Sequence, residues 1–244
     1  MLFLVVIALV ATIGVIMHRG GRYADGIRAA WASLRAYVVI APATFLYLLI
    51  VMVTTWVIVS SSDPVGYLLL ATRSSTLHVL LTAPVRGFVQ SAFWLDSVWE
   101  LPVVIAYSFL LAPVEQWLGT LRWLIVAIMG HVGATLLVAV LIWAAIAANL
   151  SSGESVHGID VGVSYAFGAV AGIFTYRLRP PLRWIFPATL LSILVLILAV
   201  QPTYTAVGHI VAVLIGLGLG RLTRDEGPLS RSEGPIYPRP LWRG

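Results

Sequence analysis

Two segments of the chain each combine one reactive side chain with a stripe of small residues. In the first, Ser164, Gly168 and Gly172 are spaced four residues apart, so on a helix they lie along one face. The second repeats this arrangement behind His209, where the small residues are Ala212, Gly216 and Gly220. A serine hydroxyl beside an imidazole is the minimum needed for a nucleophile that is activated by a general base. The spacing therefore predicts a pair of Ser164 and His209, provided that the two helices meet.

The composition places both segments in a membrane. Hydrophobic residues make up 60% and charged residues 10% of the 244 residues, whereas the average soluble domain carries roughly 25% charged residues. Together with a mean hydropathy of +0.97, this predicts an all-α polytopic membrane protein. Glycine and alanine on facing sides let two membrane helices approach closely. Both stripes are therefore predicted to be packing surfaces between the serine helix and the histidine helix.

The residue types also exclude several kinds of chemistry. The chain has no cysteine, which excludes disulfides, thiolate catalysis and cysteine-based metal sites. No cluster of His, Asp and Glu has the spacing of metal ligands, so we expect no metal and no cofactor. His131 lies inside a predicted span, where ionisable groups are rare and often functional. It is a candidate accessory residue, whereas His78 and His157 are interpreted as surface residues of outside loops.

Seven stretches have the apolar character of bilayer helices. Residues 1–17 form the first. The basic segment 18–35 follows it, either as an amphipathic helix on the cytoplasmic surface or as an ordinary juxtamembrane loop. Six further spans are predicted within residues 36–222, at 37–59, about 94–113, 124–148, 162–176, 185–200 and 206–222.

Residues 60–100 cannot cross the bilayer, because they contain charged residues and prolines. The segment is nevertheless rich in apolar and aromatic residues, among them Phe88, Phe93 and Trp94. Half-polar segments with many aromatic rings settle where headgroups meet hydrocarbon. We therefore predict a large interfacial loop over about 60–100.

The arginines are distributed unevenly between the two sides of this topology. The side that carries 18–35 also receives 112–123, 176–184 and 220–244, and it holds 13 of the 15 arginines. The positive-inside rule makes that side cytoplasmic. The basic composition is then explained by topology, and no nucleic-acid partner is expected. The tail, 223–244, is rich in Pro, Gly, Ser and Arg and is predicted to be disordered and cytoplasmic.

In this orientation Ser164 and His209 both enter the membrane from the outside. At 1.5 Å per residue, Ser164 lies about 5 Å and His209 about 8 Å below the outer face. The two side chains therefore reach similar depths. This agreement supports the predicted pair independently of the helix faces on which the two residues lie.

Three motifs make the chain similar to a known family: Glu115-x3-Gly119-x2-Arg122, Gly162-Val163-Ser164, and Gly208-His209 followed by Gly216 and Gly220. With the interfacial loop and the outside-facing pair, they resemble the rhomboid intramembrane serine proteases over about residues 36–222. The resemblance implies a six-helix core, with residues 1–17 as one extra N-terminal transmembrane helix. It also implies that Ser164 is the nucleophile and His209 the general base, in a dyad without a carboxylate.

The chain departs from the rhomboid pattern near this dyad. Rhomboid proteases usually have glycine after the serine, where this chain has Tyr165. They also carry a His-x3-Asn pair that supports the oxyanion, and those places fall near Trp99 and Val103. Losing one oxyanion donor typically costs about 10²- to 10³-fold in rate. The candidate replacements are the backbone N–H groups of Gly162 and Val163, with Tyr165, His131 and Glu100 as candidate accessory residues.

Two hypotheses of different classes remain open. The first is an intramembrane serine protease that cleaves transmembrane segments of membrane proteins. The alternative is a catalytically silent rhomboid-fold protein that binds the membrane helices of its clients. A small transporter is disfavoured, because the sequence shows no internal repeat and no carboxylate in the middle of a span. Either way the partners are membrane helices and the lipid bilayer, and the expected location is a bacterial cytoplasmic membrane with the C-terminus in the cytoplasm.

Overall fold

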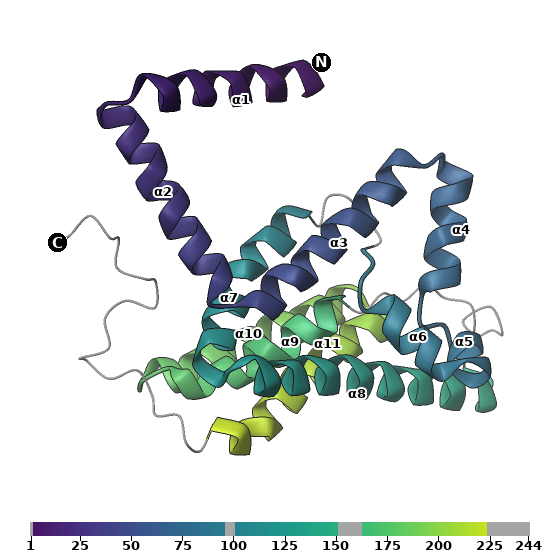
Figure 1. Ribbon diagram of the computed structural model, residues 1–244. Helices are drawn as coiled ribbons and strands as arrows, with labels where there is room; N and C mark the ends of the chain where they lie inside the picture. Colours follow the sequence, from purple (N-terminus) through teal and green to yellow (C-terminus); the bar gives the residue numbers. More distant parts are fainter. Residues whose placement is uncertain (1, 96–100, 151–162, 224–244) are drawn as a thin grey trace. The chain divides into compact units, whose positions relative to one another are not determined.

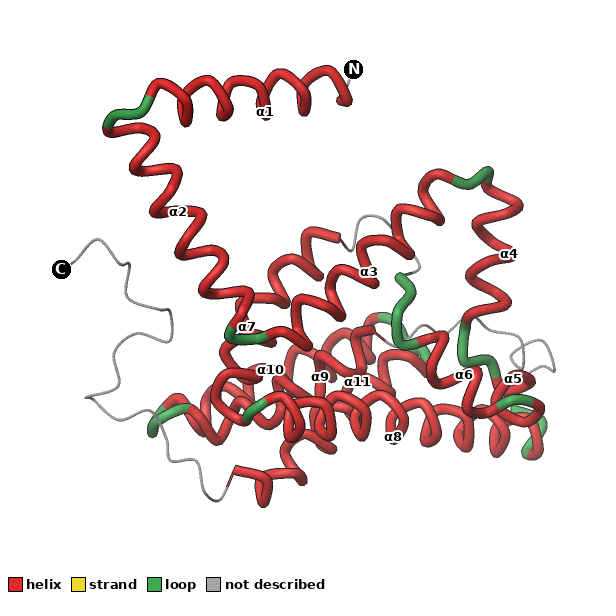
Figure 2. The backbone as a smooth tube through the Cα atoms, viewed as in Figure 1, coloured by secondary structure: helices red, strands yellow, loops and turns green. Residues whose placement is uncertain are grey.

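The computed structural model describes residues 2–95, 101–150 and 163–223, with side chains over 11–95, 107–150 and 163–223. Within these residues every regular element is a helix (Figure 2). Residues 1–40 belong to one compact unit and residues 41–223 to another. The predicted all-α membrane class is confirmed.

The first unit consists of two helices, α1 (Leu2–Arg19) and α2 (Arg22–Val39) (Figure 1). They are separated by Gly20 and Gly21, whose φ angles are +70° and +86°. Only glycine adopts such angles without a steric cost, so the pair ends α1. The basic segment 18–35 is thus mostly helical, as one of its two interpretations required. Its position at the membrane surface stays a prediction.

The predicted span 37–59 is wrong at its beginning. Helix α2 continues to Val39, and a separate helix, α3 (Pro42–Ser60), begins at the proline. Proline lacks the N–H that would continue a helix and disfavours helical angles at the residue before it. Ala41 accordingly has φ −137° and ψ 61°. Pro42 then occupies the first turn of α3, where a missing N–H costs nothing.

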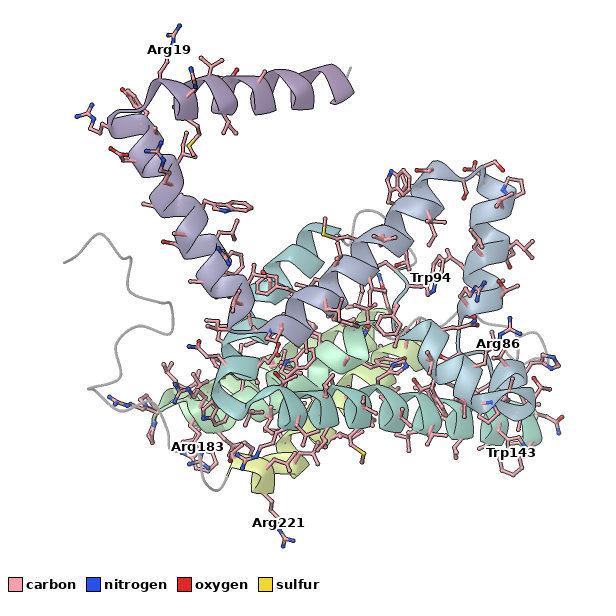
Figure 3. The ribbon with its side chains drawn as sticks, viewed as in Figure 1. Arg19, Arg86, Trp94, Trp143, Arg183 and Arg221 are labelled. Atoms are coloured by element: carbon pink, nitrogen blue, oxygen red, sulfur yellow. The ribbon has the colours of Figure 1, made fainter. Side chains whose placement is uncertain are left out.

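Among the described residues, four helices of the second unit are long and apolar enough to cross a membrane, as a multi-pass membrane protein requires. They are α3, α8 (Thr120–Ala147), α10 (Leu182–Val200) and Tyr204–Thr223, which joins α11 (Tyr204–Gly218) to a 3₁₀ turn at Leu219–Thr223. Arg183 lies at the end of this unit where α8 begins, and Arg86 and Trp143 lie at the end where α8 finishes (Figure 3).

Helix α9 (Val163–Phe174), which carries the serine, is the buried centre of the second unit. A 3₁₀ turn at Thr175–Arg177 follows it, so the predicted end near residue 176 agrees with the structure. Most of its residues are buried against α8 and α11, which also pack against each other. In Figure 1, α9 lies behind α8. No residue of α10 is buried, by contrast. The short serine helix is therefore held by its neighbours on nearly all sides.

The segment predicted as an interfacial loop contains three short helices, α4 (Asp63–Arg73), α5 (Leu77–Thr82) and α6 (Pro84–Ser91). Two side chains of α3 form hydrogen bonds with the backbone of the residues that follow α6. The Tyr47 hydroxyl donates to the Ala92 carbonyl oxygen at 2.9 Å, and the Thr54 hydroxyl donates to that of Phe93 at 2.5 Å. The position of this segment at the membrane interface stays a prediction.

The connection between the predicted spans at about 94–113 and 124–148 is shorter in the structure. Helix α7 (Leu101–Leu118) continues through Pro113, and only Gly119, with φ +78°, separates it from α8. Proline is tolerated inside a membrane helix when neighbouring groups satisfy the freed carbonyl. Residues 96–100, 151–162 and 224–244 lie outside the described part of the chain, so the connection between the predicted spans 124–148 and 162–176 and the prediction for the tail are not tested.

Candidate functional site

The small-residue stripes of α9 and α11 lie directly against each other. A β-carbon on Gly216 would collide with the carbonyl oxygen of Ala169, and one on Gly172 with that of Val213. A β-carbon on Gly168 would lie 3.2 Å from that of the buried Ala212. The two backbones are therefore closer than larger side chains would allow, as small residues permit in membrane helices. Gly220 plays a similar part farther along, where a β-carbon would meet the ring of Tyr176 at 2.6 Å.

This close packing brings the two reactive side chains together. His209 Nε2 and Ser164 Oγ are 2.8 Å apart, which is the hydrogen bond that the sequence predicted. When Nε2 carries no proton, the serine hydroxyl donates and the nitrogen accepts. Both residues are only partly buried, so a reacting group can approach them. The geometry is that of a hydroxyl beside a nitrogen that can take its proton.

Tyr165, the residue that departs from the rhomboid pattern, packs beside the histidine. Its ring meets that of His209 edge-on, with centroids 5.3 Å apart and an interplanar angle of 69°. Its side chain is fully buried (0% exposed). A β-carbon on Gly208 would lie 2.5 Å from the Tyr165 hydroxyl oxygen. The tyrosine therefore fits because residue 208 has no side chain.

The amino end of α11 is fixed by its own sequence. Thr203 is the N-cap residue, and its hydroxyl accepts the Ala206 N–H at 3.1 Å. Such a cap satisfies one of the N–H groups that have no acceptor within the helix. His209 lies in the second turn, so the cap helps to hold the depth of the imidazole.

The residues expected to support an oxyanion are only partly described. Val163 is the first residue of α9 and is buried. Gly162, Trp99 and Glu100 lie outside the described residues, and of Val103 only the backbone is described, within α7. The predicted support by the N–H groups of Gly162 and Val163 therefore stays a prediction.

His131, another candidate accessory residue, contacts helix α6. Its Nε2 lies 2.9 Å from the Phe88 carbonyl oxygen and 3.3 Å from the Ser91 hydroxyl oxygen, both in α6. The imidazole therefore joins α8 to α6. Its sequence context, an ionisable group in a span, did not indicate this partner.

Glu115 has a structural role, as a hydrogen-bond acceptor between two helices, that the sequence did not reveal. Its side chain is 1% exposed. Its carboxylate accepts the N–H groups of Ala43 at 3.1 Å and Thr44 at 2.7 Å, and the Thr120 hydroxyl at 2.8 Å. A carboxylate at a helix N-terminus satisfies unpaired N–H groups and interacts favourably with the helix dipole. Glu115 thus joins the amino ends of α3 and α8. Its place before Gly119 in the recognised motif was the signal available.

The described residues contain no group of three or more His, Asp or Glu side chains arranged to hold a metal ion.

Comparison with known proteins adds the family. No curated protein and no solved structure matches the chain significantly. A family model described as "Rhomboid-like protein" matches residues 36–229. The match contains α3 to α11, the Glu115 motif and both members of the serine–histidine pair. The chain therefore belongs to the family of rhomboid-like proteins.

Proposed function

We propose that this protein is an intramembrane serine protease in which Ser164 is the nucleophile and His209 the general base. The observation that carries the proposal is the distance of 2.8 Å between Ser164 Oγ and His209 Nε2. It is supported by the partial exposure of both residues and by their predicted depth near the outer face. The proposed substrate is a transmembrane segment of another membrane protein, locally unwound at the cleaved bond.

The chemistry follows from these two groups. Ser164 Oγ attacks the carbonyl carbon of a peptide bond while His209 Nε2 takes the hydroxyl proton. The C–N bond then breaks, and the imidazolium returns the proton to the leaving amine nitrogen. A water molecule, deprotonated by the same imidazole, hydrolyses the acyl ester and releases Ser164. No carboxylate is needed to balance these steps.

The developing oxyanion needs donors, and the start of α9 is the proposed source. Ser164 is the second residue of this helix. N–H groups in the first turn of a helix lack intrahelical acceptors and lie at the positive end of the helix dipole. Donors held in this way stabilise charge that appears only in the transition state. They are the proposed substitute for the His-x3-Asn pair that the sequence lacks.

The test is fluorophosphonate labelling of the purified full-length protein. We expect labelling at Ser164 that is lost in Ser164→Ala. Ser91→Ala is a matched control, because Ser91 also lies within 3.3 Å of a histidine nitrogen, and it should retain labelling. Labelling that persists in Ser164→Ala would contradict the proposal.

The absence of a His-x3-Asn pair favours a second candidate, a silent rhomboid-like protein that binds client helices. In that case the hydrogen bond between Ser164 and His209 is structural. Folded protein that is neither labelled nor able to cleave a helix-destabilised membrane substrate would support this candidate. For either function, we propose that the protein lies in a bacterial cytoplasmic membrane with its C-terminus in the cytoplasm. The uneven distribution of the arginines supports this orientation.

A further inference from the structure

A deep apolar cleft lies in the second unit, away from the serine–histidine pair. Its volume is about 500 Å³, which is within the range of small-molecule sites. Helices α3 and α8 form its sides and α6 covers one end, while residues of α7 and α9 form the floor. Neither Ser164 nor His209 lines it.

The floor and the rim of the cleft differ in exposure. The floor includes Leu111 (2% exposed) and Val170 (0% exposed). Leu46 and Ile128 line the rim and are 59% and 56% exposed. Since α3 and α8 are long and apolar enough to span the membrane, exposed side chains between their ends face hydrocarbon. The cleft therefore opens from the protein interior into the lipid.

Polar atoms contribute almost nothing to the surface of the cleft. The Tyr47 hydroxyl donates to the Ala92 carbonyl oxygen, and His131 Nε2 bonds the Phe88 carbonyl oxygen. The remaining lining residues are aliphatic, aromatic or alanine. The Trp123 indole nitrogen has no hydrogen-bond partner among the described residues, but it is buried and so is not exposed to the space. A ligand in this cleft would therefore meet almost no polar surface, whereas a water molecule needs two to four polar partners. The lining selects a hydrocarbon chain.

We propose that the cleft binds one acyl chain of a membrane phospholipid. Its mouth continues the lipid-facing surface, so the molecules already in contact with the rim are lipid tails. An empty cleft would forfeit dispersion contacts along its whole lining, and a chain that enters regains them. The bound chain would lie between α3, α6 and α8 and touch Phe167 of the serine helix. The interfacial helix α6 would then rest partly on lipid.

The experiment uses the full-length protein in vesicles of phosphatidylethanolamine and phosphatidylglycerol that contain a phospholipid with a diazirine in mid-chain. After illumination, crosslinked residues are mapped by mass spectrometry. We expect residues around Trp123 and Ala127 to be labelled more strongly than α10. Helix α10 has no buried residue and so reports ordinary surrounding lipid. Equal or weaker labelling in the cleft would overturn the proposal.

Variants that fill the cleft sharpen this test. Ala127→Phe should lower cleft labelling about tenfold, equivalent to roughly 1.4 kcal/mol of lost binding, and leave α10 labelling unchanged. Ala144→Phe, at an exposed position of the same helix, should have no effect on the cleft. Ala92→Phe fills the space from the chain that follows α6, and it serves if Ala127→Phe does not fold. Unchanged cleft labelling in a folded filling variant would overturn the proposal.

A last arm identifies the source of the chain. Free fatty acid added in excess to the vesicles should leave cleft labelling by the phospholipid probe in place. Displacement of the probe would show that the site takes free fatty acids and would overturn the assignment to phospholipid. None of these readouts depends on proteolysis, so the cleft and the proposed function can fail separately.

Discussion

Two contacts between a serine and a histidine lie in the second unit, at different places in the fold. Ser164 Oγ is 2.8 Å from His209 Nε2, between α9 and α11. Ser91 Oγ is 3.3 Å from His131 Nε2, between α6 and α8. Both histidines sit on helices of membrane-spanning character. The two contacts thus share residue types and differ in their surroundings.

The surroundings decide which histidine can act as a base. His131 Nε2 also lies 2.9 Å from the Phe88 carbonyl oxygen, and a carbonyl oxygen only accepts hydrogen bonds. Nε2 must therefore carry the proton in that bond, and a protonated nitrogen cannot take a proton from Ser91. Ser91 is also fully buried, whereas Ser164 and His209 are partly exposed. A short serine–histidine distance indicates catalysis only when the nitrogen has a free lone pair and a substrate can reach the hydroxyl.

Removing each histidine in turn is the most direct test of this difference between His209 and His131. His209→Ala should lower cleavage of a helix-destabilised membrane substrate about 10²- to 10⁴-fold, the usual contribution of a general base. His131→Ala should leave the rate per folded molecule unchanged. The double variant Ser164→Ala with His209→Ala should be no slower than either single variant, because the two residues act as one unit. Equal losses in both histidine variants would show that the comparison is wrong.

The next prediction tests how far the close packing of α9 and α11, which brings Ser164 and His209 together, stabilises the protein. Gly216→Ala should destabilise the protein by about 1–3 kcal/mol, because the new β-carbon would press on Ala169 and force the helices apart. Denaturant or thermal unfolding in detergent measures this change. Gly218→Ala is the matched control, since nothing lies within 4 Å of its β-carbon. If both variants unfold alike, the close approach does not stabilise the fold.

A smaller effect is expected where Tyr165 packs against Gly208. Gly208→Ala should slow fluorophosphonate labelling about tenfold, equivalent to roughly 1.4 kcal/mol, because the tyrosine must move and His209 packs against its ring. Combining it with Tyr165→Leu removes the atoms that the β-carbon would meet, so labelling should partly recover. Additive losses in this double-mutant cycle would mean that the two residues do not interact.

The smallest effect is expected at the structural contact. His131→Ala should cost about 0.5–1.5 kcal/mol, the net contribution of one hydrogen bond. Proteolysis of the 60–95 segment should become faster, since α6 loses a bond to α8. His78→Ala, at an exposed position of α5, should change neither quantity. Unaltered stability and proteolysis in His131→Ala would show that this contact does not hold the interfacial segment.

Much of the fold follows from local sequence, and so does the helix face on which each residue of the site lies. The apolar lengths of α3, α8, α10 and α11 identify spans, since a bilayer requires a minimum number of apolar residues. The spacing of Ser164, Gly168 and Gly172 places them on one face, because helical periodicity depends only on backbone geometry. The break at Pro42 was also encoded locally, although the uncharged run across it concealed the boundary.

The tertiary structure alone decided which of these faces meet. His131 and His209 both lie in apolar helices, and nothing local distinguishes a histidine that bonds a backbone carbonyl of α6 from one that bonds a serine hydroxyl of α9. Tyr165, which follows Ser164, is accommodated by Gly208, which is 43 positions away in the printed chain. Glu115 likewise accepts hydrogen bonds from Ala43 and Thr44, on another helix. Such pairings depend on packing between distant segments, which the periodicity of a single helix does not record.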